Sequence, residues 1–320
     1  MITFPARYVS INLFPRDPDP PKSRIRLSNI ILLPSNNVNE LNVMDSIPRT
    51  CFTFWQGKQF SKLHYYTIYS LVKYNPGVDI IVYTSSSPRD VLVDWETDEH
   101  SIPIVNTVPF SSLNDFAGRI KIIHVDFQEE YGISNDISVV HKADFLRIAK
   151  LYEHGGIWFD FDILFIRPIP LFIFSRSGTH MYFFHYSYSI PTGFIACRAN
   201  ISIMEEMLTR AKQLVMEPGG YQKIGPTLWT TVFIENINSL RNHVCLDTDI
   251  IYPYEATTIH ETLKIAGGVN KITERTVGIH WYNGSKAIKN FINKPKNSVM
   301  YPSQCILNQY IHKVHTDLFL

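Results

Sequence analysis

Two carboxylates separated by one residue, Asp160 and Asp162, are the strongest chemical feature of the sequence. They follow the apolar run 157–159, which predicts a buried strand ending just before them. Residues i and i+2 of a strand point the same way, and partial unwinding at the strand's end lets both carboxylates reach one ion directly or through water. Paired carboxylates at the carboxyl end of a strand suit a hard cation that binds phosphate oxygens. We therefore predict a Mn²⁺ or Mg²⁺ site here.

A bare Asp-x-Asp is more often a pair of solvated loop acids. Here the pair lies inside a mainly apolar stretch, 157–174, where an unpaired carboxylate is costly to bury. The residues that precede it also favour a site. Asp144 and Arg147 are three apart on the best predicted helix, 139–154, and so share a face. Gly155-Gly156 then ends that helix, and the strand follows at once.

The elements around this segment predict an α/β fold with a mostly parallel sheet and helices on its faces. A short apolar strand at 51–55, an amphipathic helix at 62–74 and a fully apolar strand at 79–84 follow one another. Later elements are expected at the following positions: strands 181–185 and 193–197, a helix at 201–216 and a helix that begins near Thr227.

Composition limits the function classes. The 320 residues are 45% apolar and 18% charged, so the chain can bury a sizeable core. A net charge of +1 removes the electrostatic argument for a nucleic-acid or anionic-membrane partner. Aromatic residues make up 13%, which suits a large core or platforms for ring-shaped ligands. Proline density separates an N-terminal extension, 1–46, from one domain, 47–320.

The expected location is cytoplasmic. The N-terminus has no basic region followed by an apolar one, so we expect no signal peptide. Charges and prolines interrupt the most apolar run, 157–174, so we expect no membrane span. The cysteines are widely spaced and predict free thiols; they are Cys51, Cys197, Cys245 and Cys305.

The segment 143–162 reads A-D-x-x-R-x-x-x-L-Y-x-x-G-G-I-x-x-D-x-D and resembles the sugar-binding DXD region of glycosyltransferase family 32. The glucosylating bacterial toxins are more distant relatives. The resemblance implies a GT-A glycosyltransferase fold, which is a Rossmann-like, mostly parallel sheet with helices on both faces. It implies that Asp160 and Asp162 bind the metal and the nucleotide diphosphate. It also implies that Asp144 and Arg147 hold hydroxyls of the donor sugar.

Weaker similarity extends over most of 47–286. Residues 47–57 resemble the family's opening strand, I-P-K-x-x-H-x-x-W-x-G, and imply that Trp55 stacks on the nucleotide base. Cys51 or Phe52 stands where relatives often have His, which is a departure in the nucleotide pocket. Residues 192–198 resemble the strand after which acceptor contacts are built, and Gly225-Pro226-Thr227 resembles the family's T-G-P before a helix.

A late histidine completes the expected site. In related metal-dependent sugar transferases a late His completes the coordination sphere, which implies His280 as a third metal ligand beside Asp160 and Asp162. Lys286, in the Gly-Ser-Lys turn that follows, is the implied contact to the diphosphate. The other histidines considered, His64 among them, are interpreted as structural or surface residues.

Taken together, these features predict a metal-dependent, retaining glycosyltransferase with Asp144, Arg147 and Asp162 as catalytic residues. It would move a hexose from a nucleotide-diphosphate sugar to a hydroxyl acceptor such as a glycan. UDP-sugars are favoured and GDP-mannose is possible. One alternative is a non-catalytic sugar-binding protein on the same fold. The other is a phosphatase of the haloacid dehalogenase type, but Leu164 stands where those enzymes want Thr or Val.

Overall fold

The computed structural model describes residues 46–85, 107–116, 118–186, 189–217, 222–265, 268–293 and 305–316. The predicted proline-rich extension, 1–46, lies outside the described residues except for Ser46. The division into an extension and one domain, 47–320, stays a prediction. Within the described part of the chain, no helix is both long and apolar enough to cross a membrane.

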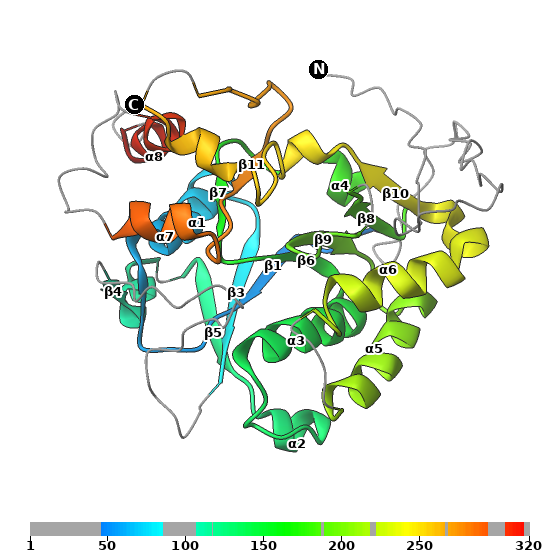
Figure 1. Ribbon diagram of the computed structural model, residues 1–320. Coiled ribbons are helices and arrows are strands. Elements are labelled where there is room, and N and C mark those ends of the chain that lie inside the picture. Colours follow the sequence, from blue (N-terminus) through cyan, green and yellow to red (C-terminus); the bar gives the residue numbers. More distant parts are fainter. Residues whose placement is uncertain are drawn as a thin grey trace, which may run out of the picture.

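A seven-stranded sheet forms the centre of the structure (Figure 1). Its strands lie in the order β10 (His243–Leu246), β8 (Met181–Phe184), β9 (Phe194–Cys197), β6 (Gly156–Phe159), β1 (Thr50–Phe54), β3 (Asp79–Thr84) and β5 (Ile120–His124). Every neighbouring pair is parallel except the two pairs that β9 makes, with β6 and with β8. The predicted mostly parallel α/β sheet is therefore confirmed.

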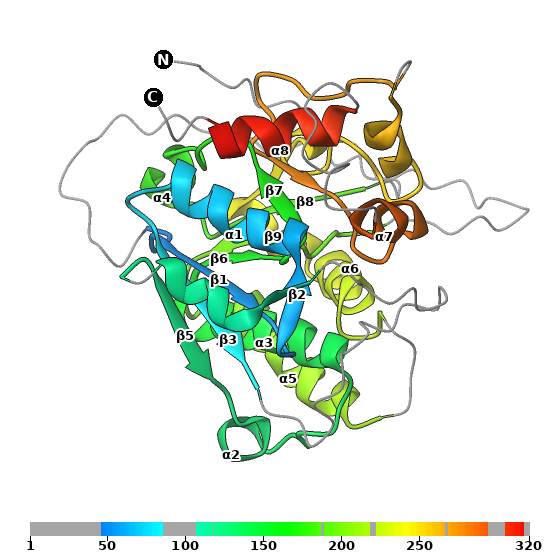
Figure 2. The same cartoon turned by 90° about the vertical axis from the view of Figure 1, so that its left-hand side faces the viewer.

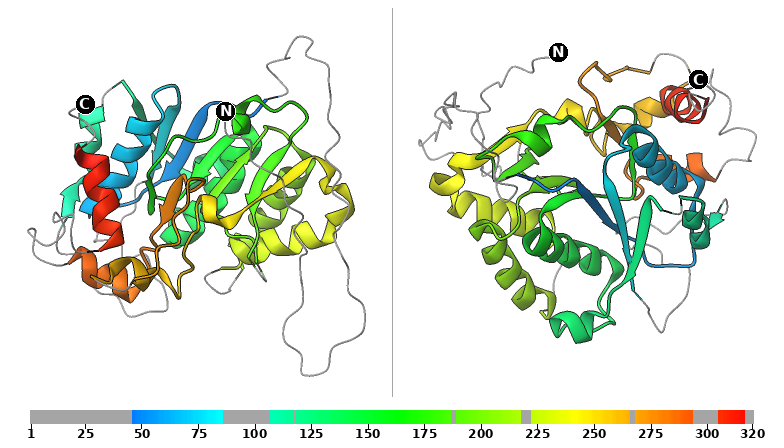
Figure 3. Two further views of the ribbon diagram at one scale, coloured as in Figure 1. Left: turned by 90° about the horizontal axis from the view of Figure 1, so that it is seen from above. Right: turned by 180° about the vertical axis from the view of Figure 1, so that it is seen from behind.

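Helices cover both faces of this sheet, as predicted. Side chains alternate along β1, so Phe52 and Phe54 face one core cluster while Cys51 faces another. The first cluster is built with α3 (Val139–His154), α5 (Ser202–Val215) and α6 (Pro226–Glu235). The second is built with α1 (Lys62–Tyr74). Figure 2 and Figure 3 show α3 and α5 on one side of the sheet and α1 on the other.

The link between α3 and β6 needs both of its glycines. Gly155 ends α3 with φ +64°, and a Cβ there would lie 2.5 Å from the backbone nitrogen of Ala199. Gly156 has φ +105°, and its Cβ would lie 2.6 Å from the carbonyl oxygen of Thr50 on β1. Only glycine adopts these angles without strain and lets the backbones approach so closely. The pair therefore turns α3 directly into the central strand.

The antiparallel strand β9 brings a second loop to the carboxyl end of β6. Phe194 pairs with Phe159, so the residues just before β9 lie beside the residues just after β6. The backbone N–H of Asp160 donates to the carbonyl of Gly193 at 2.7 Å. In open α/β sheets this edge, beyond the carboxyl ends of the strands, is where ligands bind.

A separate two-stranded pair lies above the main sheet. β7 (Ile163–Phe165) and β11 (Gly278–His280) are antiparallel, with His280 opposite Ile163, and α1 packs against β7. A second small pair joins β2 (Gln59–Ser61) to β4 (Thr107–Pro109). The remaining helices are α2 (Phe127–Tyr131), α4 (Phe172–Ser175), α7 (Lys286–Ile292) and α8 (Ile306–Thr316), with 3₁₀ turns at Phe110–Phe116, Ile237–Asn242, Thr248–Ile250 and Ile259–Leu263.

We predict that His243 makes the stability of the fold depend on pH. Its ring is 5% exposed at the start of β10, and burial lowers its pKa from 6.5 to about 4. Between these two values the unfolded chain binds more protons than the folded one, so stability falls as the pH falls. Lowering the pH from 8 to 5 should therefore reduce the free energy of unfolding by about 2 kcal/mol through this residue.

Urea unfolding of the wild type and of His243→Phe at pH 8 and at pH 5 measures the contribution of His243 to the pH dependence. Phe keeps a buried ring but cannot titrate. The difference in free energy of unfolding between the two proteins should become smaller or change sign at pH 5, because the wild type loses stability. An equal loss in both proteins would show that His243 is not the cause.

Candidate active site

A cavity of about 280 Å³ opens at the carboxyl end of the sheet. This volume is close to the lower end of the range for ligand pockets, about 300 Å³, so the cavity has room for a ligand. The α3 side and the loops after β6 and before β9 form one wall, and residues of β1, α1 and the segment after β11 form another. The polar and aromatic residues that line it are Thr53, Phe54, Trp55, His64, Asp144, Arg147, Trp158, Asp160, Phe161, Asp162, Tyr186, Thr192, Gln222, Tyr252, His280, Tyr282 and Asn283.

Arg147 is the centre of the polar wall. Its guanidinium is 4% exposed and donates to Asp144, to the Thr192 hydroxyl at 2.7 Å and to Asp160 Oδ1 at 2.8 Å. Burial by itself lowers the pKa of an arginine, but the carboxylates of Asp160 and Asp144 outweigh burial and raise it. Asp144 and Arg147, which were predicted to share one face of the helix, thus form a buried ion pair. Arg147 also contacts Asp160, the residue that follows β6.

Asp144 is a buried carboxylate whose pKa is raised to about 6, because burial disfavours its charged form more than Arg147 favours it. Gly225, just before α6, lies directly against it: a Cβ on Gly225 would come within 2.7 Å of Asp144 Oδ2. The sequence Gly225-Pro226 therefore begins α6 with its backbone packed on this carboxylate.

Asp160 is held by two donors on one oxygen. Trp158 Nε1 and Arg147 Nη2 both donate to Oδ1, each at 2.8 Å. Burial tends to raise the pKa of Asp160, but Arg147 holds it well below the usual range of a carboxyl group. Its other oxygen, Oδ2, lies 3.9 Å from His280 Nε2 and accepts none of these bonds.

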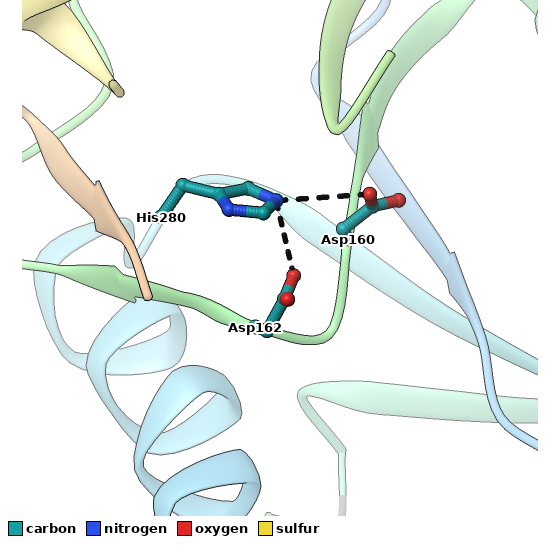
Figure 4. Close-up of side chains that lie close together, drawn as sticks. All are labelled: Asp160, Asp162 and His280. Carbon is teal, nitrogen blue, oxygen red and sulfur yellow. Dashed lines mark ion pairs between the residues drawn. The ribbon is translucent and has the colours of Figure 1, made fainter. Parts of the chain in front are cut away.

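Asp162 and His280 face each other across the loop before β7 (Figure 4). His280 Nε2 lies 3.2 Å from Asp162 Oδ1, and the backbone N–H of Asn283 donates to Asp162 Oδ2 at 2.8 Å. Burial raises the pKa of Asp162. Burial opposes protonation of His280, but the carboxylates of Asp162 and Asp160 outweigh it and raise the pKa of His280.

The segment after β11 is shaped around this histidine. Tyr282 has φ +53°, in the left-handed region that a tyrosine seldom adopts. This turn places the ring centroid of Tyr282 4.2 Å from that of His280. It also lets the backbone N–H of Asn283, the next residue, reach Asp162. Backbone strain of this kind persists where surrounding contacts over-determine it, and it is concentrated at functional sites.

The three residues Asp160, Asp162 and His280 fit a divalent cation. Each offers one ligand atom, and the three atoms lie within 4.8 Å of one another. A Cβ on Gly193 would come within 2.9 Å of both Asp160 Oδ2 and His280 Nε2, so a glycine keeps this space open. Two carboxylates with one imidazole suit Mn²⁺, and a carboxylate-rich site also admits Mg²⁺.

Of the two remaining predicted site residues, one lines the cavity and the other does not. Trp55 lines the cavity, with its ring 5.3 Å from that of Phe161. Lys286 is exposed at the first position of α7 and is not part of the cavity lining, so its contact with a diphosphate stays a prediction.

Several lining residues were not predicted. His64 was interpreted as structural or surface, yet it lines the cavity at 1% exposure. The rings of Tyr252 and Tyr282 pack on the His280 ring from separate loops, and the hydroxyl of Tyr186 lies 3.2 Å from that of Tyr282. Tyr282 follows the singled-out His280 by two residues, which is the one signal that was available for it.

Comparison with known families agrees with this geometry. The family model described as glycosyltransferase sugar-binding region containing DXD motif matches residues 61–179. That range holds Asp144, Arg147, Asp160 and Asp162 and excludes Trp55 and His280. The class of protein is therefore that of the DXD glycosyltransferases, as predicted. The match spans less than half of the chain and does not single out family 32, so membership in that family stays a prediction.

Among solved structures the chain is similar to the PaToxG glycosyltransferase, at 17% identity and a TM-score of 0.46 over 61% of this chain and 71% of that one. It is similar to the galactosyltransferase LgtC in complex with donor and acceptor sugar analogs, at 11% identity and a TM-score of 0.42 over 78% and 98% of the two chains. It is also similar to GlyE in Streptococcus pneumoniae, at 12% identity and a TM-score of 0.42 over 83% and 64%. Structural similarities with TM-scores this low support no conclusion about ligands. No curated protein sequence matches the chain.

We predict that Gly193→Ala weakens metal binding. The added methyl would enter the space between Asp160 Oδ2 and His280 Nε2 and push the two groups apart. Displacing residues at a metal site lowers affinity about tenfold or more. Calorimetric titration with Mn²⁺ in the presence of UDP measures the change.

Gly77→Ala is the matched control, since a Cβ there meets nothing nearer than Arg49 Nη1 at 3.8 Å. This control should bind Mn²⁺ like the wild type. Unchanged Mn²⁺ affinity in Gly193→Ala would mean that the ion does not occupy this space.

Proposed function

We propose that the protein is a metal-dependent glycosyltransferase that moves a hexose from a nucleotide-diphosphate sugar to a hydroxyl acceptor such as a glycan, with retention of configuration. The observation that carries the proposal is a single cavity where the Asp160–Asp162–His280 cluster adjoins the Asp144–Arg147 pair. A UDP-sugar is the favoured donor, with GDP-mannose as the second choice.

Asp160, Asp162 and His280 would hold the Mn²⁺ or Mg²⁺ ion. When bound, the ion supplies Lewis-acid stabilisation of the charge that develops on the leaving diphosphate. The protein's part is to keep the ligand atoms in place. Arg147 and Trp158 secure Asp160 through Oδ1, and the Asn283 N–H secures Asp162 through Oδ2. Each carboxylate is thus left with one oxygen directed at His280.

Asp144 and Arg147 are proposed to hold hydroxyls of the donor sugar. A buried carboxylate accepts hydrogen bonds from hydroxyls, and a buried guanidinium donates to their oxygens. Both side chains line the cavity and are anchored to each other, so their position is set before a ligand arrives. Trp55, on the opposite wall, is the proposed platform for the nucleotide base.

Retention is proposed to proceed by front-face displacement. The acceptor oxygen forms its bond to the anomeric carbon on the face from which the diphosphate oxygen departs, and the departing phosphate takes the acceptor's proton. Among the described residues, the carboxylates that line the cavity are Asp144, Asp160 and Asp162. Arg147 engages the first two and His280 faces the third, which supports a mechanism without a carboxylate nucleophile.

We propose a cytoplasmic location for this activity. All four cysteines are free thiols, and burial raises the pKa of Cys245 to about 12, which keeps that thiol protonated and unreactive.

We predict that hydrolysis or transfer of a UDP-sugar requires Mn²⁺ or Mg²⁺ and that Asp162→Asn abolishes it. The amide keeps the size of the side chain and an oxygen for the Asn283 N–H but removes the charged ligand. Activity should fall at least about a hundredfold while the melting temperature stays within a few degrees. Release of UDP, measured with and without chelator, checks both points.

Arg210→Gln is a control that removes charge from a partly exposed ion-pair network on α5, outside the cavity lining. It should retain wild-type turnover. Full activity in excess chelator, or near wild-type turnover in Asp162→Asn, would refute the metal-dependent mechanism.

A further inference from the structure

His64 occupies an aromatic slot on the α1 wall of the cavity. Its ring centroid lies 4.8 Å from that of Trp55 and 4.8 Å from that of Trp281, and 5.8 Å from the Phe161 ring. The residue is 1% exposed and still lines the cavity. Neither the metal cluster nor the Asp144–Arg147 pair accounts for a histidine here.

The start of α1 fixes which ring nitrogen of His64 carries the proton. Ser61 is the N-cap, and its hydroxyl accepts from the backbone N–H of His64 at 3.2 Å. In return, the backbone N–H of Ser61 donates to His64 Nδ1 at 3.2 Å, and the Ser61 hydroxyl lies 2.7 Å from the same nitrogen. A nitrogen that accepts a hydrogen bond has no proton, so the proton of the neutral ring lies on Nε2.

The ring is neutral under ordinary conditions, because complete burial lowers the pKa of His64 to about 3. Nε2 is therefore a permanent hydrogen-bond donor. Two indole rings pack against the imidazole and Ser61 occupies Nδ1, while within the described chain no protein group accepts a bond from Nε2. A donor that lines a cavity without a protein acceptor must find its acceptor there, and a ligand in the cavity can supply one.

We propose that His64 Nε2 donates a hydrogen bond to an oxygen of the donor's nucleoside diphosphate, an inference that rests on the proposed function. The nucleotide is the part of the donor that this wall fits. His64 lies beside Trp55 and Phe161 in the core cluster of the α1 face, whereas the sugar-binding pair belongs to α3 on the opposite face.

The same geometry argues against two other roles for His64. A metal ligand needs an unprotonated nitrogen, and the Ser61 contacts place the lone pair on Nδ1, inside the helix cap. A general base would need a pKa nearer neutrality than burial allows here. The residue is thus a neutral binding group rather than a catalytic residue.

Calorimetric titration of UDP in the presence of Mn²⁺ tests the proposal with three variants. His64→Phe keeps a ring between the two tryptophans but removes the donor, and should weaken UDP binding about tenfold. His64→Gln offers an amide N–H in its place and should lose less. Ser61→Ala removes the capping hydroxyl but leaves the backbone N–H on Nδ1, so it should bind UDP within about twofold of the wild type.

Titration with uridine separates the two sources of the acceptor oxygen. A tenfold loss for both uridine and UDP places it on the base or ribose, and a loss for UDP alone places it on a phosphate. Equal UDP affinity in the wild type and in a folded His64→Phe would overturn the inference. If His64→Phe does not fold, equal affinity in a folded His64→Leu, which also lacks the ring N–H, overturns it. No UDP binding by the wild type would instead refute the proposed function.

Discussion

The contact on which the site depends is the buried guanidinium of Arg147 between the carboxylates of Asp144 and Asp160. Two carboxylates that close together in a buried place would repel each other and become protonated unless a cation lay between them. Arginine suits this task because its planar group stays charged and offers several donors in fixed directions. By engaging Oδ1 of Asp160, it leaves Oδ2 on the side of His280. The orientation of Asp160 in the proposed metal site therefore follows from an ion pair that begins on α3.

The sheet topology brings the other groups to this ion pair. Because β9 runs antiparallel to β6, the loop before β9 places Thr192 and Gly193 against Arg147 and Asp160. The pairing of β7 with β11 brings His280 to Asp162. The contact of the loop before β9 depends on the main sheet, and the contact of His280 depends on the small β7–β11 pair. The cavity lies where these two sheets meet. The absence of a side chain at Gly193 leaves the space between the carboxylate and the imidazole open.

The two walls of the cavity differ in character. The α3 wall is charged and built from paired groups, which suits hydroxyls and a cation with its phosphates. The α1 wall is aromatic, with Trp55 and His64 in one packed cluster, which suits the flat part of a nucleotide. The near-zero net charge of the chain fits the proposed function, in which a cation rather than a basic surface would meet the phosphates of the donor.

The sequence alone was sufficient for the groups joined by short-range geometry. The spacing of Asp144 and Arg147 on a helix, and of Asp160 and Asp162 after a strand, follows from backbone periods that steric repulsion and local hydrogen bonds impose. The mostly parallel sheet with helices on both faces was predicted from the same periods. His280 was reached only through a family resemblance, because its approach to Asp162 depends on strand pairing between segments more than a hundred residues apart. His64 shows the limit most clearly: its cap at Ser61 is local, but its place in the cavity wall was decided by the packing of α1 on β7, which involves the whole core.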